Sequence, residues 1–165
     1  MVAKVKSRSF GLNVNAADLP KLDKSQWMRS YVLAGIFLVL ALVQLVTFSD
    51  FKDALGAMGV TSATEWGICV IIAEVIAALG LVKLPLSFLA RSICAVMAIL
   101  AAGFWFILNL QSISSGLDVM PNLGLFGGVL EQSPGWWTTI ETSVLLIWTL
   151  HILSLMMPSG SVAKR

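Results

Sequence analysis

One apolar stretch with a single acidic residue sets the strongest constraint on how this chain can fold. Residues 66–84, WGICVIIAEVIAALGLVKL, come close to the ~20 residues that an α-helix needs to cross a bilayer. Glu74 follows Glu65 by nine residues, which puts it roughly 13 Å along the helix and near the bilayer midplane. Because a carboxyl group in hydrocarbon costs free energy, Glu74 must have a hydrogen-bonding partner or a function.

The composition extends this argument from one helix to the whole chain. Of the 165 residues 58% are hydrophobic and 12% are charged, whereas about a quarter of the residues in soluble domains are charged. A water-soluble core cannot bury so much apolar surface, so we expect lipid to surround the protein. The sequence predicts an all-α integral membrane four-helix bundle with spans at about 31–48, 66–84, 88–110 and 139–157.

The remaining segments predict how the bundle is oriented. Residues 1–30 form a basic N-terminal segment, 111–138 a long outer loop and 158–165 a short tail. Four spans within 31–157 put both termini on one side, and ten of the eleven Lys and Arg residues lie on that side. By the positive-inside rule, both termini are cytoplasmic and the protein is a multi-pass protein of the cytoplasmic (inner) membrane.

Short polar motifs predict where the helices begin. Ser25 and Ser87 are expected N-caps of the first and third spans. The S-x-x-E motif at 62–65 and the T-x-x-E motif at 138–141 have the spacing of capping boxes for the second and fourth spans. Between the first two spans, an apolar face at positions 51, 55 and 58 predicts a short helix lying on the membrane surface.

Glu74 has two interpretations. It is either a proton relay or an anchor for a polar ligand or quinone head group, since acidic residues inside membranes are functional candidates. The simpler interpretation is a protonated carboxyl group that is hydrogen-bonded to a neighbouring helix.

His151 and Thr149 are the nearest candidate partners of Glu74 by depth. His151 is the only histidine and lies in the inner half of the fourth span, while Thr149 lies closer to the depth of Glu74. A contact from either residue to Glu74 is therefore expected. A lone histidine in a span is more often a helix–helix hydrogen-bonding residue than a ligand. Because no Cys or carboxylate lies at matching helical spacing, we predict neither a metal site nor a catalytic set.

The outer loop contains a glycine-rich motif around Asn122, Gly124, Phe126 and Gly127. Glycines at such positions let the backbone approach a partner or ligand closely. The motif is not a phosphate-binding loop, because no Gly-Lys-Ser/Thr follows it. The simpler interpretation is a re-entrant or interfacial hydrophobic turn.

Two of these motifs resemble the DoxX/MauE family of small four-span membrane proteins. Glu74 followed by Ala77-Ala78-Leu79-Gly80-Leu81 is similar to that family's E-x-x-G-G-x-x-L pattern, and the loop motif resembles the MauE-type N-C-G-C-F-G. The resemblance implies a four-helix fold and a role beside a redox or respiratory complex. Leu123 and Leu125 stand where MauE-type proteins have cysteines, so their thiol–disulfide exchange does not carry over, because exchange needs a thiolate.

Three functions follow as hypotheses. The first is a non-catalytic accessory or assembly subunit of a membrane complex, whose partners are lipid and either another membrane protein or a second copy of the chain. The second is a quinone-linked oxidoreductase subunit in which Glu74 accepts protons; a quinone is the only cofactor that any of these readings calls for. The third is a small transporter, which is weaker because the spans lack interrupted helices. No basic cluster with interleaved aromatic residues indicates a nucleic-acid partner.

Overall fold

The computed structural model describes residues 20–116, 125–126, 128–129 and 132–156, and within these residues the chain is all-helical. Its helices are α1 (Lys24–Val46), α2 (Phe48–Ala57), α3 (Ala63–Leu81), α4 (Phe88–Ser114) and α5 (Trp136–Met156). In this part of the chain four helices, all except α2, are long and apolar enough to cross a membrane. The predicted fold class is therefore confirmed.

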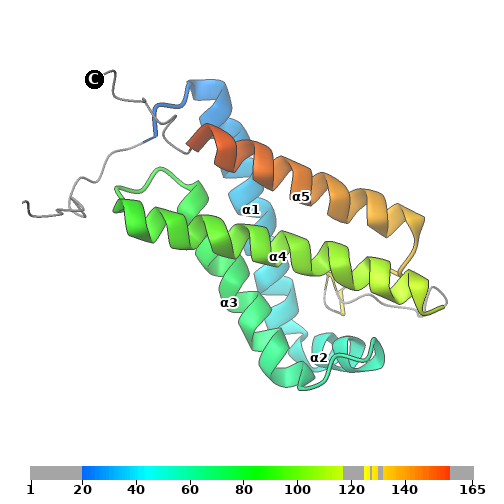
Figure 1. Ribbon diagram of the computed structural model, residues 1–165. Coiled ribbons are helices and arrows are strands. Elements are labelled where there is room, and N and C mark those ends of the chain that lie inside the picture. Colours follow the sequence, from blue (N-terminus) through cyan, green and yellow to red (C-terminus); the bar gives the residue numbers. More distant parts are fainter. Residues whose placement is uncertain (1–19, 117–124, 127, 130–131, 157–165) are drawn as a thin grey trace, which may run out of the picture.

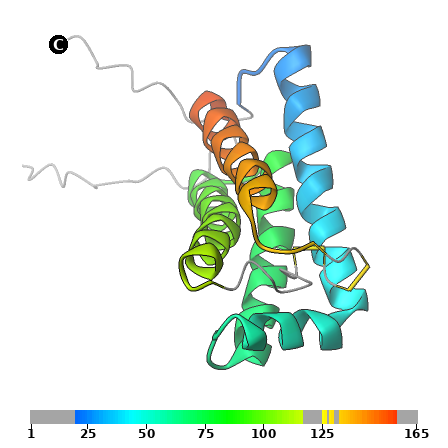
Figure 2. The same cartoon turned by 90° about the vertical axis from the view of Figure 1, so that its right-hand side faces the viewer.

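The four long helices are arranged as two pairs. α1 packs along α3, and α5 packs along α4 (Figure 1). The pairs are joined mainly through α3 and α4, with a smaller contact between α1 and α5 (Figure 2). The start of α1, the turn at 82–87 and the end of α5 lie together, at what we call the turn end of the bundle. α2 and the described residues of 125–129 lie at the opposite end, which we call the α2 end (Figure 1).

The start of α1 differs from the sequence prediction. Asp23, and not Ser25, is the N-cap: its carboxylate accepts a hydrogen bond from the Gln26 amide at 2.7 Å, and the Gln26 side chain accepts from the Asp23 amide at 3.0 Å. This reciprocal capping box starts the helix at Lys24 and leaves Ser25 inside it. The prediction for Ser87 is confirmed, because its hydroxyl accepts from the Ala90 amide at 3.2 Å.

The two predicted capping boxes are not formed. Ser62 precedes α3, but its backbone is left-handed (φ 57°) and its side chain makes no capping hydrogen bond. Thr138 lies inside α5, because that helix begins two residues earlier at Trp136. α4 also continues to Ser114, so helices occupy both edges of the segment 111–138 that was expected to be a loop.

α2 confirms the predicted short helix but corrects its surroundings. Phe51 and Leu55 are fully buried and Met58 is 4% exposed. The apolar face of α2 packs against α3 and α1, and the ring centroid of Phe51 lies 5.9 Å from that of Trp105 in α4. The amphipathic pattern of α2 thus reflects burial against the protein. The pattern alone does not distinguish this from contact with a membrane surface, because a helix presents the same kind of apolar face in both cases.

Small residues bring α3 and α4 close together toward the turn end. Ala77, Ala78, Ala95 and Ala98 are all buried along this contact. At Gly80 the approach is so close that an added methyl group would collide with the Cβ of Cys94. Close backbone approach of this kind is how small residues stabilise helix pairs in lipid, where burial supplies no hydrophobic driving force between helices.

We predict that Gly80→Ala lowers stability in detergent by about 1–3 kcal/mol, because the Cβ of Cys94 cannot rotate away from the added methyl. Gly35→Ala is the matched control, since no atom lies within 4 Å of a methyl group at that position. Thermal unfolding of both variants measures the difference. Cys94→Gly should restore the loss in the Gly80→Ala background; equal stability of the two single variants would contradict the packing argument.

Candidate functional site

The carboxyl group of Glu74 joins three helices inside the bundle. Glu74 is fully buried in α3, and its Oε1 atom accepts hydrogen bonds from Trp105 Nε1 in α4 at 2.9 Å and from Gln44 Nε2 in α1 at 3.2 Å. We call these three residues the Glu74 cluster. The simpler interpretation, a carboxyl group hydrogen-bonded to a neighbouring helix, describes this geometry.

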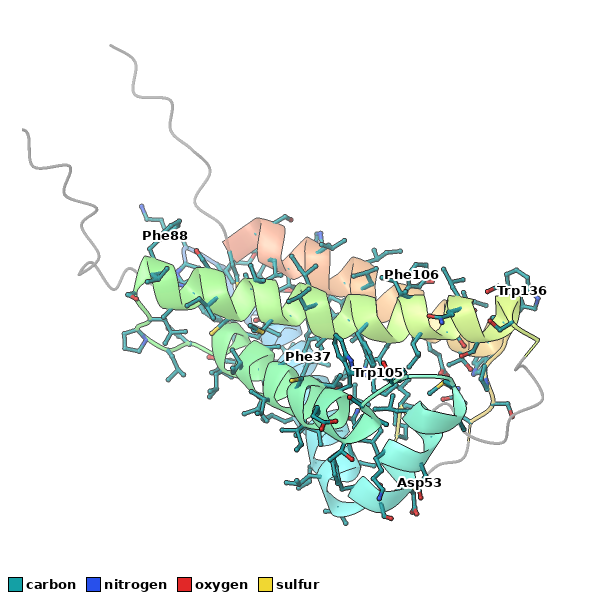
Figure 3. The ribbon with its side chains drawn as sticks, turned by 60° about the horizontal axis from the view of Figure 1, so that its bottom comes forward. Phe37, Asp53, Phe88, Trp105, Phe106 and Trp136 are labelled. Atoms are coloured by element: carbon teal, nitrogen blue, oxygen red, sulfur yellow. The ribbon has the colours of Figure 1, made fainter. Side chains whose placement is uncertain are left out.

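Helical periodicity explains why these polar groups point inward. Gln44 continues the buried stripe of Phe37 and Ala41 in α1, and Trp105 continues that of Ala98 and Ala102 in α4. Such i, i+3/i+4 spacing places each residue on the face that meets the other helices. Trp105 lies beneath α4 on the side of α2 and α3 (Figure 3), and its indole ring is fully buried.

Two oxygen atoms of the cluster remain without a hydrogen-bond partner among the described residues. These are Glu74 Oε2 and Gln44 Oε1. An amide oxygen accepts hydrogen bonds, and a neutral carboxylic acid carries one O–H that must be donated. Both residues that bind Glu74 are themselves uncharged. Each of the two oxygens therefore has hydrogen-bonding capacity that the described residues do not use.

Leu125 lies against the cluster from the loop between α4 and α5. Gln44 Nε2 donates a second hydrogen bond, of 3.1 Å, to the Leu125 carbonyl oxygen, and the Leu125 side chain is 4% exposed. A short distance along the loop, the amide of Gly128 donates to Thr47 Oγ1 at 2.7 Å. One amide side chain thus connects the buried carboxyl group to the loop between α4 and α5.

The predicted outer-loop motif is only partly described. Phe126 is half-buried and packs against the hydrophobic core. Asn122, Gly124 and Gly127 lie outside the described residues. Within the motif, Leu125 contacts the Glu74 cluster through its carbonyl oxygen. It is one of the two leucines at the MauE-type cysteine positions.

The expected contact between Glu74 and the fourth span is not formed. The hydroxyl of Thr149 is fully buried but donates to the Leu145 carbonyl of its own helix at 2.7 Å. His151 is exposed on the outside of α5. Two residues at the same depth in neighbouring helices do not necessarily face each other. The hydrogen-bond partners of Glu74 are Gln44 and Trp105, and not Thr149 or His151.

The sequence contained one signal for Gln44 and none for Trp105. Gln44 is a polar amide within an apolar span, and such residues usually hydrogen-bond across helices. Trp105 lies in a Phe-Trp-Phe run that is typical of apolar packing in a span, and its spacing to Glu74 in the sequence does not predict the contact.

A second polar contact fixes the start of α5. Asn109 in α4 is fully buried, and its Nδ2 donates to Thr139 Oγ1 at 2.6 Å. Its Oδ1 accepts from the Gly135 amide at 3.3 Å, directly before the helix. Asn109 therefore satisfies backbone and side-chain groups at a helix terminus, which is a structural role.

Neither the geometry nor the comparisons assign a metal. Among the described residues no group of three or more His, Cys, Asp and Glu side chains could hold a metal ion. The chain matches no protein-family model, and neither a curated protein nor a solved structure matches it.

We predict that Trp105→Phe destabilises the bundle by about 1 kcal/mol, because it removes one interhelical hydrogen bond to Glu74 while keeping an aromatic ring. Trp66→Phe is the control, since Trp66 is half-exposed and stacks on Phe104 without holding Glu74. Thermal unfolding in detergent compares the two variants. A larger loss for Trp66→Phe than for Trp105→Phe would show that the indole hydrogen bond does not hold the helices together.

Proposed function

We propose that this protein is a non-catalytic accessory or assembly subunit of a larger membrane complex. The observation that carries the proposal is the Glu74 cluster, in which an intramembrane acid is used to join α1, α3 and α4. The bundle is thereby a preformed unit that can present its outer surfaces to another protein. On those surfaces the spans are rich in large apolar side chains, such as Leu42, Ile72, Ile107 and Ile147.

The charge distribution supports a location in the cytoplasmic membrane with both termini on the cytoplasmic side. Lys21, Lys24, Lys83 and Arg91 belong to the turn end, and the acidic residues of α2 lie at the other end. Under the positive-inside rule the turn end faces the cytoplasm.

The resemblance to the DoxX/MauE family supports the same role. It is carried by the region after Glu74 and by the loop motif, and the family's association with redox enzymes suggests a redox or respiratory complex as the partner. Leucine at both cysteine positions makes a contact role for the loop more fitting than a redox role, because leucine supplies no thiolate.

A second candidate, a quinone-linked oxidoreductase subunit, is favoured by one specific observation. Glu74 Oε2 has no partner among the described residues, and a buried carboxyl oxygen without a partner is available to exchange a proton with a bound head group. In this reading Glu74 accepts protons and Leu125 lies over the head-group site.

Two substitutions at Glu74 separate these functions. We predict that Glu74→Gln keeps the fold and the co-purifying partner, because its amide oxygen still accepts from Trp105 and Gln44. Glu74→Met leaves the Trp105 indole without an acceptor and leaves Gln44 Nε2 with the Leu125 carbonyl as its one acceptor. The variant should lose about 1–3 kcal/mol of stability together with partner binding. Purification of each tagged variant in mild detergent, followed by mass spectrometry of bound proteins, measures the outcome.

A protein that purifies alone in every case would contradict the accessory role. For the second candidate, the same Glu74→Gln protein should be folded but inactive in quinone reduction. Quinone-dependent activity that survives Glu74→Gln would exclude Glu74 as the proton acceptor.

A further inference from the structure

Among the described residues, the interior of the bundle holds more buried polar side chains toward the α2 end than toward the turn end. Toward the α2 end, the buried side chains include Gln44, Asn109, Ser112 and Thr142. Ser112 and Thr142 donate their hydroxyl hydrogens to carbonyl groups of their own helices, so their oxygens keep free acceptor capacity. Toward the turn end the buried polar residues among those described are Ser30, whose hydroxyl is bonded to the Leu81 carbonyl, and Thr149, whose hydroxyl donates to the Leu145 carbonyl of its own helix.

The turn end is closed by tight packing. Below Glu74 in α3 follow Ala77, Ala78 and Leu81, none more than 2% exposed. Gly80 meets Cys94 so closely that no methyl group fits between α3 and α4. A polar molecule that reached Glu74 from this end would have to separate two helices that are in backbone-level contact.

The α2 end is closed differently. There the Glu74 cluster meets a loop residue, Leu125, whose carbonyl oxygen occupies one of the two hydrogens of the Gln44 amide. Displacing Leu125 breaks one described hydrogen bond and exposes one buried side chain, whereas entry at the turn end would separate α3 from α4. The first change costs less free energy, because it disrupts fewer buried contacts. Displacing Leu125 would free that Gln44 hydrogen beside the two unpaired oxygens, Glu74 Oε2 and Gln44 Oε1.

We propose that Glu74 and Gln44 form a binding site for the hydroxyl group of a small uncharged amphiphile, which enters from the α2 end and takes the place of Leu125. The proposal goes beyond the accessory role. It uses the same residues as the quinone-linked candidate, but it requires only that a hydroxyl group binds, with no proton or electron transfer, so the site can be present when that candidate function is not.

The chemistry of the cluster selects a hydroxyl group. The site offers one donor, Gln44 Nε2, and an amide oxygen that needs a donor, Gln44 Oε1. A hydroxyl group both accepts and donates through one oxygen, whereas an ether or ketone only accepts. An apolar body would replace the Leu125 side chain in the hydrophobic core, since a ligand site needs apolar lining around few polar groups.

Access can be tested with the full chain in vesicles and a water-soluble carbodiimide, which modifies carboxyl groups. Leu125→Ala should increase modification of the Glu74 peptide about tenfold over wild type when the reagent is added on the α2 side. Leu84→Ala, a change of the same size in the partly exposed turn, is the control and should leave modification unchanged. Melting temperatures establish that both variants are folded.

Ligand class can be tested with para-pentylphenol and its methyl ether, para-pentylanisole, which differ by one hydroxyl hydrogen. The phenol should protect Glu74 from carbodiimide in Leu125→Ala and raise the melting temperature of wild type, and the ether should do neither. In Gln44→Leu the difference between the two compounds should disappear. Pentylammonium serves as the charged comparison and should protect less than the phenol.

Three results would overturn the proposal. The first is modification of Glu74 that is equally fast from the turn side. The second is a Leu125→Ala protein that is folded but no more reactive than wild type. The third is protection that does not favour the phenol. Equal protection by the phenol and the ether would mean that the hydroxyl group has no role, and stronger protection by pentylammonium would indicate a cation site.

Discussion

The hydrogen bonds that converge on Glu74 Oε1 are the interaction on which the rest of the structure depends. In a bilayer, apolar side chains gain little by leaving lipid for each other, so helices associate through close packing and polar contacts. Glu74 supplies the polar contact for three of the four spans, through Gln44 in α1 and Trp105 in α4. Without an acceptor at this position, the buried Trp105 indole N–H and one hydrogen of the Gln44 amide would have no partner. Each unpaired N–H group would cost free energy, because lipid offers no acceptor.

Close packing and polar bonding are divided between the two ends of the bundle. At the turn end, alanines and Gly80 let α3 pack closely against α4, because larger side chains at these positions would push the two helices apart. At the α2 end the helices accommodate larger groups, and the indole of Trp105, the face of α2 and Leu125 fill the interior. This is where a carboxyl group, an amide and an indole meet, and it is the end from which we propose that a ligand enters.

Gln44 connects the interior of the bundle to the loop between α4 and α5, so the loop contributes to the surroundings of the buried acid. Its amide donates to the Glu74 carboxyl group and to the Leu125 carbonyl, so the position of the loop and the hydrogen bonding of the buried acid are linked through a single side chain. This coupling is compatible with an accessory subunit, in which the loop contacts a partner, and with a subunit in which the loop covers a ligand.

The sequence alone determined the fold class, because long apolar runs with few charges have one stable solution in lipid: helices that satisfy their own backbone groups. It also located Glu74 as the exceptional residue and predicted the short amphipathic helix, which is confirmed as α2. Local signals did less well. Ser87 caps α4 as expected, but Asp23 took the place of Ser25, and the motifs at Ser62 and Thr138 form no capping box, because a cap depends on where the chain enters the helix.

Only the tertiary structure decided which residues surround Glu74. Depth along a helix can be counted from the sequence, and by depth Thr149 and His151 were suitable partners. The rotation of each helix about its axis, and which helix it packs against, cannot be predicted from residue number. They depend on how all the side chains pack together. That packing turned Thr149 toward its own backbone and His151 outward, and brought Gln44, Trp105 and Leu125 to the acid.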